Sequence, residues 1–235
     1  MKIIFKTIAS FLLITFLAIV YLSFVGIETQ KFNNQISEKI KKINKKLDVE
    51  LNSIQIILDP FNLRINAKTI GPKLTYEKKI IDIESIKTKI SLKALLNNQF
   101  SLKNLEISTK SLDLPNTISF IRSVNNTPEF YILEKIIKGG FLIADIKLEF
   151  DKTGKIKKNY KIDGFIKDGK LNVVDTYKLD KLNFTFSSEK NTLKLRDINF
   201  LLNNLNLYSN NVSIKNLKKA FFIEGEINHN KLDLD

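Results

Sequence analysis

The chain begins with a continuous apolar run and later changes to a long stretch in which apolar and polar residues alternate. Residues 8–25 form one unbroken run of apolar, aromatic and small hydroxyl side chains, with Lys2 and Lys6 just before it. A helix of about 18–20 such residues is long enough to cross the hydrocarbon core of a bilayer. The run therefore predicts a membrane anchor over residues 1–26. The side chains expected to face lipid are Ile8, Phe11, Leu12, Leu13, Ile14, Phe16, Leu17, Ile19, Val20, Leu22, Phe24 and Val25.

A cleaved signal peptide and a buried core helix are the alternatives to a permanent anchor. A signal peptide has a shorter apolar stretch and then small residues at its cleavage site, whereas Phe24, Val25 and Ile27 are large. A core helix normally has polar interruptions on one face, and this run has none. Lys2 and Lys6 favour a cytoplasmic N-terminus, but the many lysines between residues 31 and 46 argue for the reverse. We favour a signal-anchor with a translocated body.

The next segment, residues 27–48, is expected to be an amphipathic juxtamembrane helix. Phe32, Ile36, Ile40, Ile43 and Leu47 recur at helical spacing and form one stripe, with lysines opposite. The helix is expected either to pack against the following domain or to lie on anionic headgroups. The first interpretation is the plainer one.

From residue 49 to residue 235 the period changes to two. Alternation of apolar and polar residues is typical of antiparallel strands with one buried and one wet face. A phase slip near Asn104 predicts a bulge. Turns are expected at residues 151–154 and at Asp168-Gly169, the latter a strong hairpin signal. About ten to thirteen strands are predicted.

One helical insert near residues 116–139 interrupts the strands. Thr127-Pro128-Glu129 is typical of a helix start, and a shorter helix is expected at residues 117–124. The predicted fold class is therefore mainly β: an N-terminal transmembrane helix, then a long, curved antiparallel sheet, groove-like or taco-like, with one or two short helices inserted.

Charge adds little to this picture. Lys and Arg number 38 against 25 Asp and Glu, a formal net charge of +13. Only Arg64, Arg122 and Arg196 are arginines, although Arg is the preferred residue for bidentate phosphate and base recognition. The abundance of Lys, Asn, Ile and Phe is typical of nucleotide bias. No nucleic-acid partner is expected.

Residues that support catalysis are sparse. The chain has no Cys, and its one histidine, His229, is expected in a polar turn without a predicted partner. The carboxylates are scattered beside lysines on strand surfaces, and Gly139-Gly140 lacks the pattern of a phosphate loop. Neither an enzyme nor a metal or other cofactor is expected.

A sheet with one continuous apolar face must cover that face with a second layer, with helices or with a ligand. The predicted helices are too few to cover a dozen strands. A curled sheet lined by Ile, Leu and Phe suits acyl chains, because each methylene removed from water contributes about 0.8 kcal/mol. A closed sandwich or barrel with its own core is the alternative. The groove candidates are Ile86, Ile90, Leu92, Ile146, Leu148, Phe150, Phe184, Phe186 and Phe200.

The layout resembles the N-terminal region of AsmA-like proteins. The resemblance rests on the N-terminal apolar helix and on two strand sets over residues 1–115. These sets read IQIILDPFNLRI at residues 54–65 and IKTKISLKALLNNQFSLKNLEI at residues 86–107, the second like the family's strand, short helical turn and strand.

The resemblance implies a single-pass inner-membrane protein with a periplasmic β-groove. Such a protein would bind phospholipid and support outer-membrane lipid homeostasis, with envelope proteins as further partners. Family members are usually longer, so the chain is expected to be a short member or part of a longer protein. The alternative function is a non-catalytic structural or assembly scaffold of the cell envelope with a closed β core.

Overall fold

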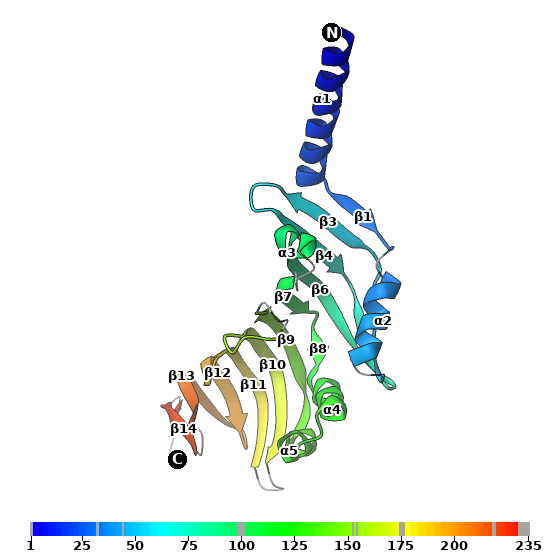
Figure 1. Ribbon diagram of the computed structural model, residues 1–235. Helices are drawn as coiled ribbons and strands as arrows, with labels where there is room; N and C mark the ends of the chain where they lie inside the picture. Colours follow the sequence, from blue (N-terminus) through cyan, green and yellow to red (C-terminus); the bar gives the residue numbers. More distant parts are fainter. Residues whose placement is uncertain are drawn as a thin grey trace.

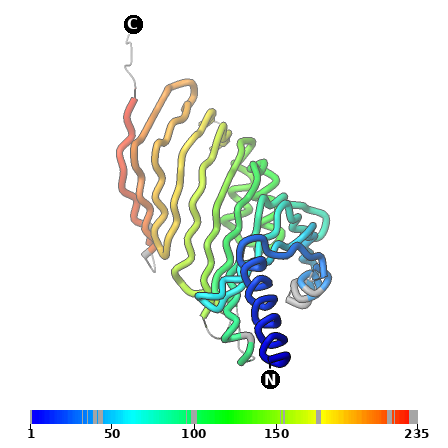
Figure 2. Tube along the Cα trace, turned by 90° about the horizontal axis from the view of Figure 1, so that it is seen from above, coloured from blue at the N-terminus to red at the C-terminus, as the bar shows by residue number. Residues whose placement is uncertain are grey.

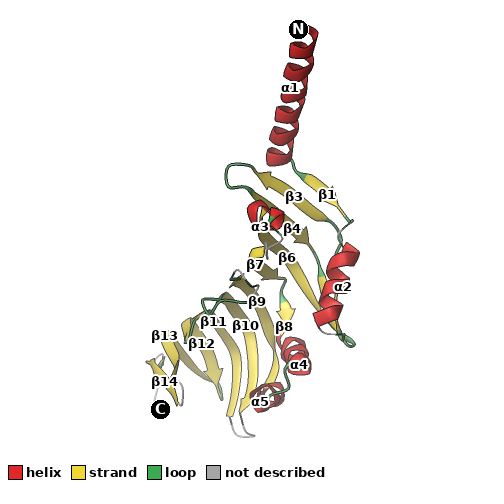
Figure 3. Ribbon diagram, viewed as in Figure 1, coloured by secondary structure: helices red, strands yellow, loops and turns green. Residues whose placement is uncertain are grey.

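One antiparallel sheet organises the chain after its N-terminal helix in the computed structural model, as Figure 1 shows. The structure describes residues 2–31, 33–43, 45–97, 102–151, 153, 155–173, 177–217 and 220–229. The helices, red in Figure 3, are α1 (Lys2–Phe24), α2 (Asn33–Ile43), α3 (Leu92–Leu96), α4 (Leu114–Val124) and α5 (Pro128–Ile136). The strands are β1 (Ile27–Thr29), β2 (Leu47–Glu50), β3 (Ile54–Asp59), β4 (Arg64–Ile70), β5 (Lys73–Tyr76), β6 (Lys79–Ser91), β7 (Leu102–Thr109), β8 (Leu112–Asp113), β9 (Ile137–Glu149), β10 (Lys161–Val173), β11 (Tyr177–Glu189), β12 (Thr192–Leu202), β13 (Leu205–Leu217), β14 (Ala220–Gly225) and β15 (Asn228–His229).

The strands follow one another across the sheet almost in chain order. The main path is β1-β3-β4-β6-β7-β9-β10-β11-β12-β13-β14, and every pairing along it is antiparallel. Seen from above in Figure 2, the strands form one layer from the N-terminal to the C-terminal end. The sheet is curved and open, as predicted, and does not close into a barrel. At about 4.8 Å per strand, the path is about 50 Å wide.

The curvature has a visible cause in the central strands. Asp168, Lys181 and Asp197 have φ values of 52°, 51° and 53°, and each lies where the pairing register slips. Gly140, with φ of 116°, faces the slip at Asp168 from β9. Bulges of this kind bend a strand and increase its twist. The row of bulges therefore bends β9 to β12 together.

The bulge at Asp168 corrects one expectation. A hairpin predicted at Asp168-Gly169 is wrong, because β10 continues to Val173 and pairs on both sides beyond this point. A positive φ serves a bulge as well as a turn, so the dipeptide alone does not distinguish them. The predicted turn near residues 151–154 does connect β9 and β10, and Asp151 Oδ1 accepts hydrogen bonds there from the backbone of Thr153 and Lys155.

The N-terminal helix α1 is a candidate membrane span. It covers 23 residues, its mean hydropathy reaches 2.4 over an 18-residue window, and none of that window is buried. It is therefore not a core helix of the described domain. By length and composition it is an anchor or a signal sequence.

The segment after α1 is not one helix over residues 27–48. The chain first forms β1, which pairs with residues Ile54 to Ile56 of β3, and only then α2. Lys41 and Ser37 bind the Asp48 carboxylate at 2.8 and 2.6 Å, and these hydrogen bonds, Lys41 first, lower the pKa of Asp48. The helix thus packs against β2, as the plainer interpretation expected. Phe32 of the predicted stripe lies outside the described residues.

Gly26 makes the abrupt change from helix to strand possible. Its φ is +76°, and its N–H donates to the Tyr21 carbonyl at 3.2 Å, closing the end of α1. A Cβ at this position would lie 2.5 Å from the Ile56 carbonyl oxygen and 2.9 Å from Ile57. The backbone at the junction is therefore in contact with β3, and only glycine fits.

We expect Gly26→Ala to destabilise the domain by more than about 2 kcal/mol. The left-handed conformation alone costs a non-glycine residue about 1–2 kcal/mol, and the contact with Ile56 adds to this cost. Gly71→Ala is the matched control, because Gly71 also has a positive φ (+67°) but its nearest neighbour, Asn52, lies at 3.4 Å. Thermal unfolding of both variants in detergent checks the difference. Equal losses would contradict the close approach at Gly26.

The helical insert was predicted close to its observed place. Residues 114–124 form α4 and residues 128–136 form α5, whose N-cap is Thr127. Leu114 and Ile118 of α4 are buried against Ile137 at the start of β9. Gly139 and Gly140, at the predicted end of the insert, lie instead inside β9.

Candidate functional site

The register of the sheet places most of its apolar side chains on one side, called here the apolar face. Residues paired across antiparallel strands point to the same side of the sheet, so the pairs trace rows across it. One row runs Thr69, Ile86, Ile107, Ile146, Ile162, Ser188, Leu193, Ile214 and Ile223. A second runs Ile56, Ala67, Thr88, Leu105 and Leu148, and a third runs Ala144, Gly164, Phe186, Leu195, Val212 and Gly225.

These rows contain no charged residue among the described pairs. The residues between them along each strand point to the opposite side, the polar face. That face carries acids, lysines and amides in the same rows, for example Lys87 beside Glu106 and Glu106 beside Lys147. The two faces therefore differ in chemistry along most of the path, although Ile143 and Phe165 pair on the polar face between β9 and β10.

The predicted groove residues fall on the apolar face with few exceptions. Ile86, Ile90, Ile146, Leu148, Phe184, Phe186 and Phe200 all lie on it by register. Phe150 follows Leu148 by two residues, and it bridges to Ile156 beyond the end of β9. Leu92 leaves the sheet, because it begins α3.

The side chains on this face are half-buried over most of its area. Among the described residues, the buried apolar members include Ile54, Ala144 and Ile198. Ile86, Leu148, Phe184 and Phe186, by contrast, all keep intermediate exposure. Side chains in neighbouring rows bury one another's sides. Over most of this area, no second layer of described residues packs in front of them.

Among the described elements, α4 and α5 cover the apolar face only beside β6, β9 and β10. Leu142, Ile166 and Leu171 pack against the buried cluster formed by Leu114, Ile118 and Ile137. At the other end of α4, the rings of Phe120 and Tyr76 meet edge to face at a centroid distance of 6.3 Å. The described helices make their main contacts with strands up to β10, and none packs to a similar extent on β11, β12 or β13.

The linkage between α4 and its surroundings is polar and specific. Lys79 Nζ donates to the Ser119 carbonyl at 2.8 Å and to the hydroxyls of Ser119 and Ser123 at 2.6 and 2.8 Å. Arg122 pairs with Glu134 of α5. Hydrogen bonds from Ser119 and then Arg122 lower the pKa of Glu134. These contacts join α4 to β6 and to α5.

Two phenylalanines lie at the centre of the apolar face. Phe184 and Phe186 are on β11, with ring centroids 6.3 Å apart. Phe186 pairs with Gly164, and a Cβ on Gly164 would lie 2.7 Å from Cζ of the Phe186 ring and against the Ile143 carbonyl. Because Gly164 has no Cβ, the Phe186 ring can pack directly over the backbone of β10.

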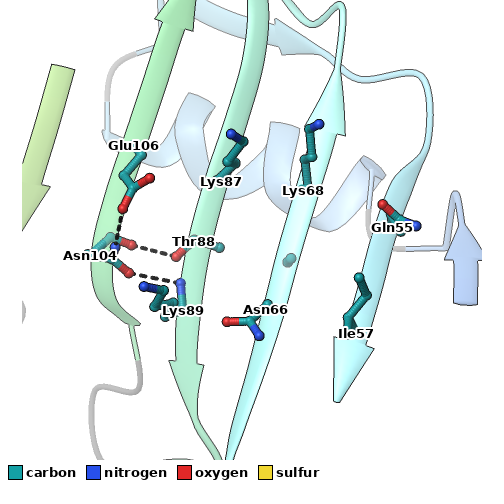
Figure 4. Close-up of a pocket in the computed structure, with 10 residues that line it drawn as sticks. Gln55, Ile57, Asn66, Lys68, Lys87, Thr88, Lys89, Asn104 and Glu106 are labelled. Atoms are coloured by element: carbon teal, nitrogen blue, oxygen red, sulfur yellow. Dashed lines mark hydrogen bonds between the residues drawn. The ribbon is translucent and has the colours of Figure 1, made fainter. Parts of the chain in front are cut away.

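The polar face has its own shallow pocket, shown in Figure 4, of about 230 Å³. It is lined by strands β3, β4, β6 and β7. Asn104 Nδ2 donates to Glu106, its Oδ1 accepts from the Lys89 N–H at 3.0 Å, and its carbonyl accepts from Thr88 at 2.6 Å. These polar groups bind one another, and the arrangement ties β6 to β7 at the predicted phase slip, where the register shifts.

Metal-binding geometry does not arise in the described part of the chain. No group of three His, Asp or Glu side chains there lies close enough to hold a metal ion. His229, expected in a turn, lies in β15 and pairs with Leu207. What the arrangement offers chemically is an extended apolar surface.

Several members of the apolar face were not singled out from the sequence. Ile162, Leu195, Leu207 and Val212 complete its rows, and all of them belong to predicted strands. The missing information was the pairing register, which decides the side of each residue. Period-two alternation fixes faces within a strand and does not relate one strand to the next.

Neither the models of protein families, nor the curated proteins, nor the solved structures gave a match to this chain.

Proposed function

We propose that this protein is a membrane-anchored lipid-binding module that shelters the acyl chains of phospholipid on the apolar face of its sheet. The observation that carries the proposal is the uncharged apolar face, which crosses the paired strands from β1 to β14 and over which no described helix packs to a large extent on β11 to β13. Apolar areas of this extent on a soluble surface mark sites of interaction with proteins or lipids.

Shape and energy both favour acyl chains as the occupant. The apolar face is about 50 Å long across the strands. A flexible acyl chain can follow its curved surface with little loss of contact. Each methylene removed from water contributes about 0.8 kcal/mol, so two acyl chains contribute on the order of 20 kcal/mol in shielding. Neither catalysis nor a cofactor is needed for such a surface to carry lipid.

The cellular setting follows from α1 and from the resemblance to AsmA-like proteins. We place α1 in the inner membrane as a single-pass anchor and the β domain in the periplasm. There it would support the lipid homeostasis of the outer membrane by bridging or transferring phospholipid. The resemblance at residues 54–65 and 86–107 supports this setting, and α3 lies between β6 and β7 where the short helical turn was expected.

Native mass spectrometry of the detergent-extracted, full-length protein tests the proposal. We expect phospholipid to remain bound at a defined stoichiometry after exchange into a mild detergent. Lipid extraction and quantification provide an independent measure. Protein that is folded by circular dichroism and carries no phospholipid would support the envelope scaffold instead.

A further inference from the structure

The end of the sheet nearest α1 carries an unusual set of exposed apolar side chains. Outside α1, the two most exposed large apolar residues of the described chain are Phe61 at 96% and Leu96 at 82%. Both lie at this end, Phe61 in the turn between β3 and β4 and Leu96 in α3, with Leu63 beside them at 56%. Residues 60–63 together with Leu96 are called here the hairpin tip.

The hairpin tip is rigidly built. Asp59 accepts hydrogen bonds from the Asn62 backbone at 3.1 Å and from the Asn62 amide at 2.9 Å, and these bonds lower the pKa of Asp59. The Leu63 N–H donates to the Pro60 carbonyl at 3.3 Å, and the Leu63 carbonyl accepts from Leu92 of α3 at 2.9 Å. Phe61 is therefore held out by a turn whose polar groups are satisfied internally.

The tip lies beside the end of the membrane-span candidate. Gly26 fixes the end of α1 against Ile56, and Phe61 follows Ile56 by five residues of β3 and its turn. At about 3.3 Å per residue, the separation along the strand is at most about 17 Å. α1 contacts β3, and Figures 1 and 2 both show the β3–β4 turn next to α1.

Cationic side chains lie just behind the apolar tip. Arg64 and Lys89 are close enough to Asp59 that their charges help to lower its pKa, after the hydrogen bonds from Asn62. Lys93 on α3 is exposed, and the buried Nε of Arg64 has no hydrogen-bond partner. An apolar tip with cations behind it matches the order of acyl chains and phosphates in a phospholipid leaflet.

We propose that the hairpin tip inserts into the leaflet from which α1 emerges and forms a second contact between the domain and the membrane. The inference rests on α1 being an anchor, which belongs to the proposed function, and does not depend on lipid binding by the apolar face. Two contacts fix the tilt of the sheet, so that the ends of β3 and β4 rest on the leaflet.

The absence of tryptophan from the chain makes a direct test possible. Phe61→Trp introduces a single tryptophan at an exposed site where the fold is not expected to change. The full-length variant is reconstituted in vesicles of phosphatidylcholine and phosphatidylglycerol. We expect its emission to shift to shorter wavelength and to lose most of its intensity when the phosphatidylcholine carries brominated acyl chains.

Ile132→Trp is the matched control, because Ile132 is 53% exposed on α5, at the far end of the domain from α1 in Figure 1. Its emission should stay water-like and unquenched. Phe184→Trp reports separately on the apolar face. Quenching at position 184 without quenching at position 61 would overturn the inference and uphold the proposed function. A shift of the position-61 emission without bromine quenching would indicate contact with a second copy of the chain and would also overturn it.

Discussion

Leu148→Glu combined with Phe184→Glu is expected to reduce co-purified phospholipid by at least about tenfold while the domain stays folded. Both residues lie on the apolar face, on β9 and β11, and neither belongs to the cluster that α4 covers, although Phe184 pairs with Ile166 at the edge of that cluster. In the lipid-free protein their half-exposed positions let a carboxylate reach water. Against acyl chains the same carboxylate has no partner, which costs several kcal/mol, and 1.4 kcal/mol already corresponds to about tenfold in affinity.

The matched control changes the same number of charges on the polar face. Thr185 adjoins Phe184 in sequence and points to the other side of the sheet, and Asn211 lies in its row beyond Arg196. Thr185→Glu with Asn211→Glu is expected to leave bound lipid unchanged. Lipid is quantified by native mass spectrometry and by extraction, and folding is followed by circular dichroism.

A third variant sets the scale for loss of folding. Ile118→Glu places a charge in the buried cluster with Leu114 and Ile137 and should unfold the helical end of the domain. If the apolar-face double variant unfolds as Ile118→Glu does, then the apolar face acts as an ordinary core. That result would favour the scaffold, and unchanged lipid in a folded double variant would contradict the groove directly.

The fold class was readable from the sequence because its signals are local. An unbroken apolar run predicted α1, and period-two alternation predicted the strands. Thr127-Pro128 predicted the start of α5, which begins at Pro128. Each of these patterns reflects the geometry of a single element, so no knowledge of distant contacts was needed.

The errors arose where the outcome depends on a pairing partner. Asp168-Gly169 has the local chemistry of a hairpin, but neighbouring strands continue past it and convert it to a bulge. Residues 27–29 are too few to show the alternation that predicts a strand. They form a strand because the chain direction at Gly26 places them beside β3. Long-range pairing decided both cases.

The candidate site was predictable only in part for the same reason. Alternation showed which neighbours share a face with Phe184 on β11 and which share a face with Ile146 on β9. Only the register shows that both residues lie on one continuous face. The exposure of the hairpin tip was not predicted. Phe61 and Leu63 fall within the strand set at residues 54–65, whereas the turn built by Asp59 and Asn62 exposes them.

Gly164→Ala is expected to destabilise the domain by about 3 kcal/mol or more, although the change adds one methyl group. The new Cβ would fall against the Ile143 carbonyl on β9 and lie 2.7 Å from the Phe186 ring on β11. Neither neighbour can move cheaply, because one is backbone in a paired strand and the other packs beside Phe184. Overpacking in well-packed regions typically costs about 1–3 kcal/mol, and a backbone contact raises that cost.

Gly139→Ala separates this effect from the general cost of changing a strand glycine. Gly139 also lies in the sheet, on β9, but its nearest neighbour is the flexible Lys170 side chain at 3.5 Å. Its replacement should leave stability unchanged or raise it by up to about 1 kcal/mol. Chemical denaturation of both variants measures the difference. Equal stabilities of the two variants would mean that β9, β10 and β11 do not approach as closely as the register requires. The apolar face would then not be continuous across these strands.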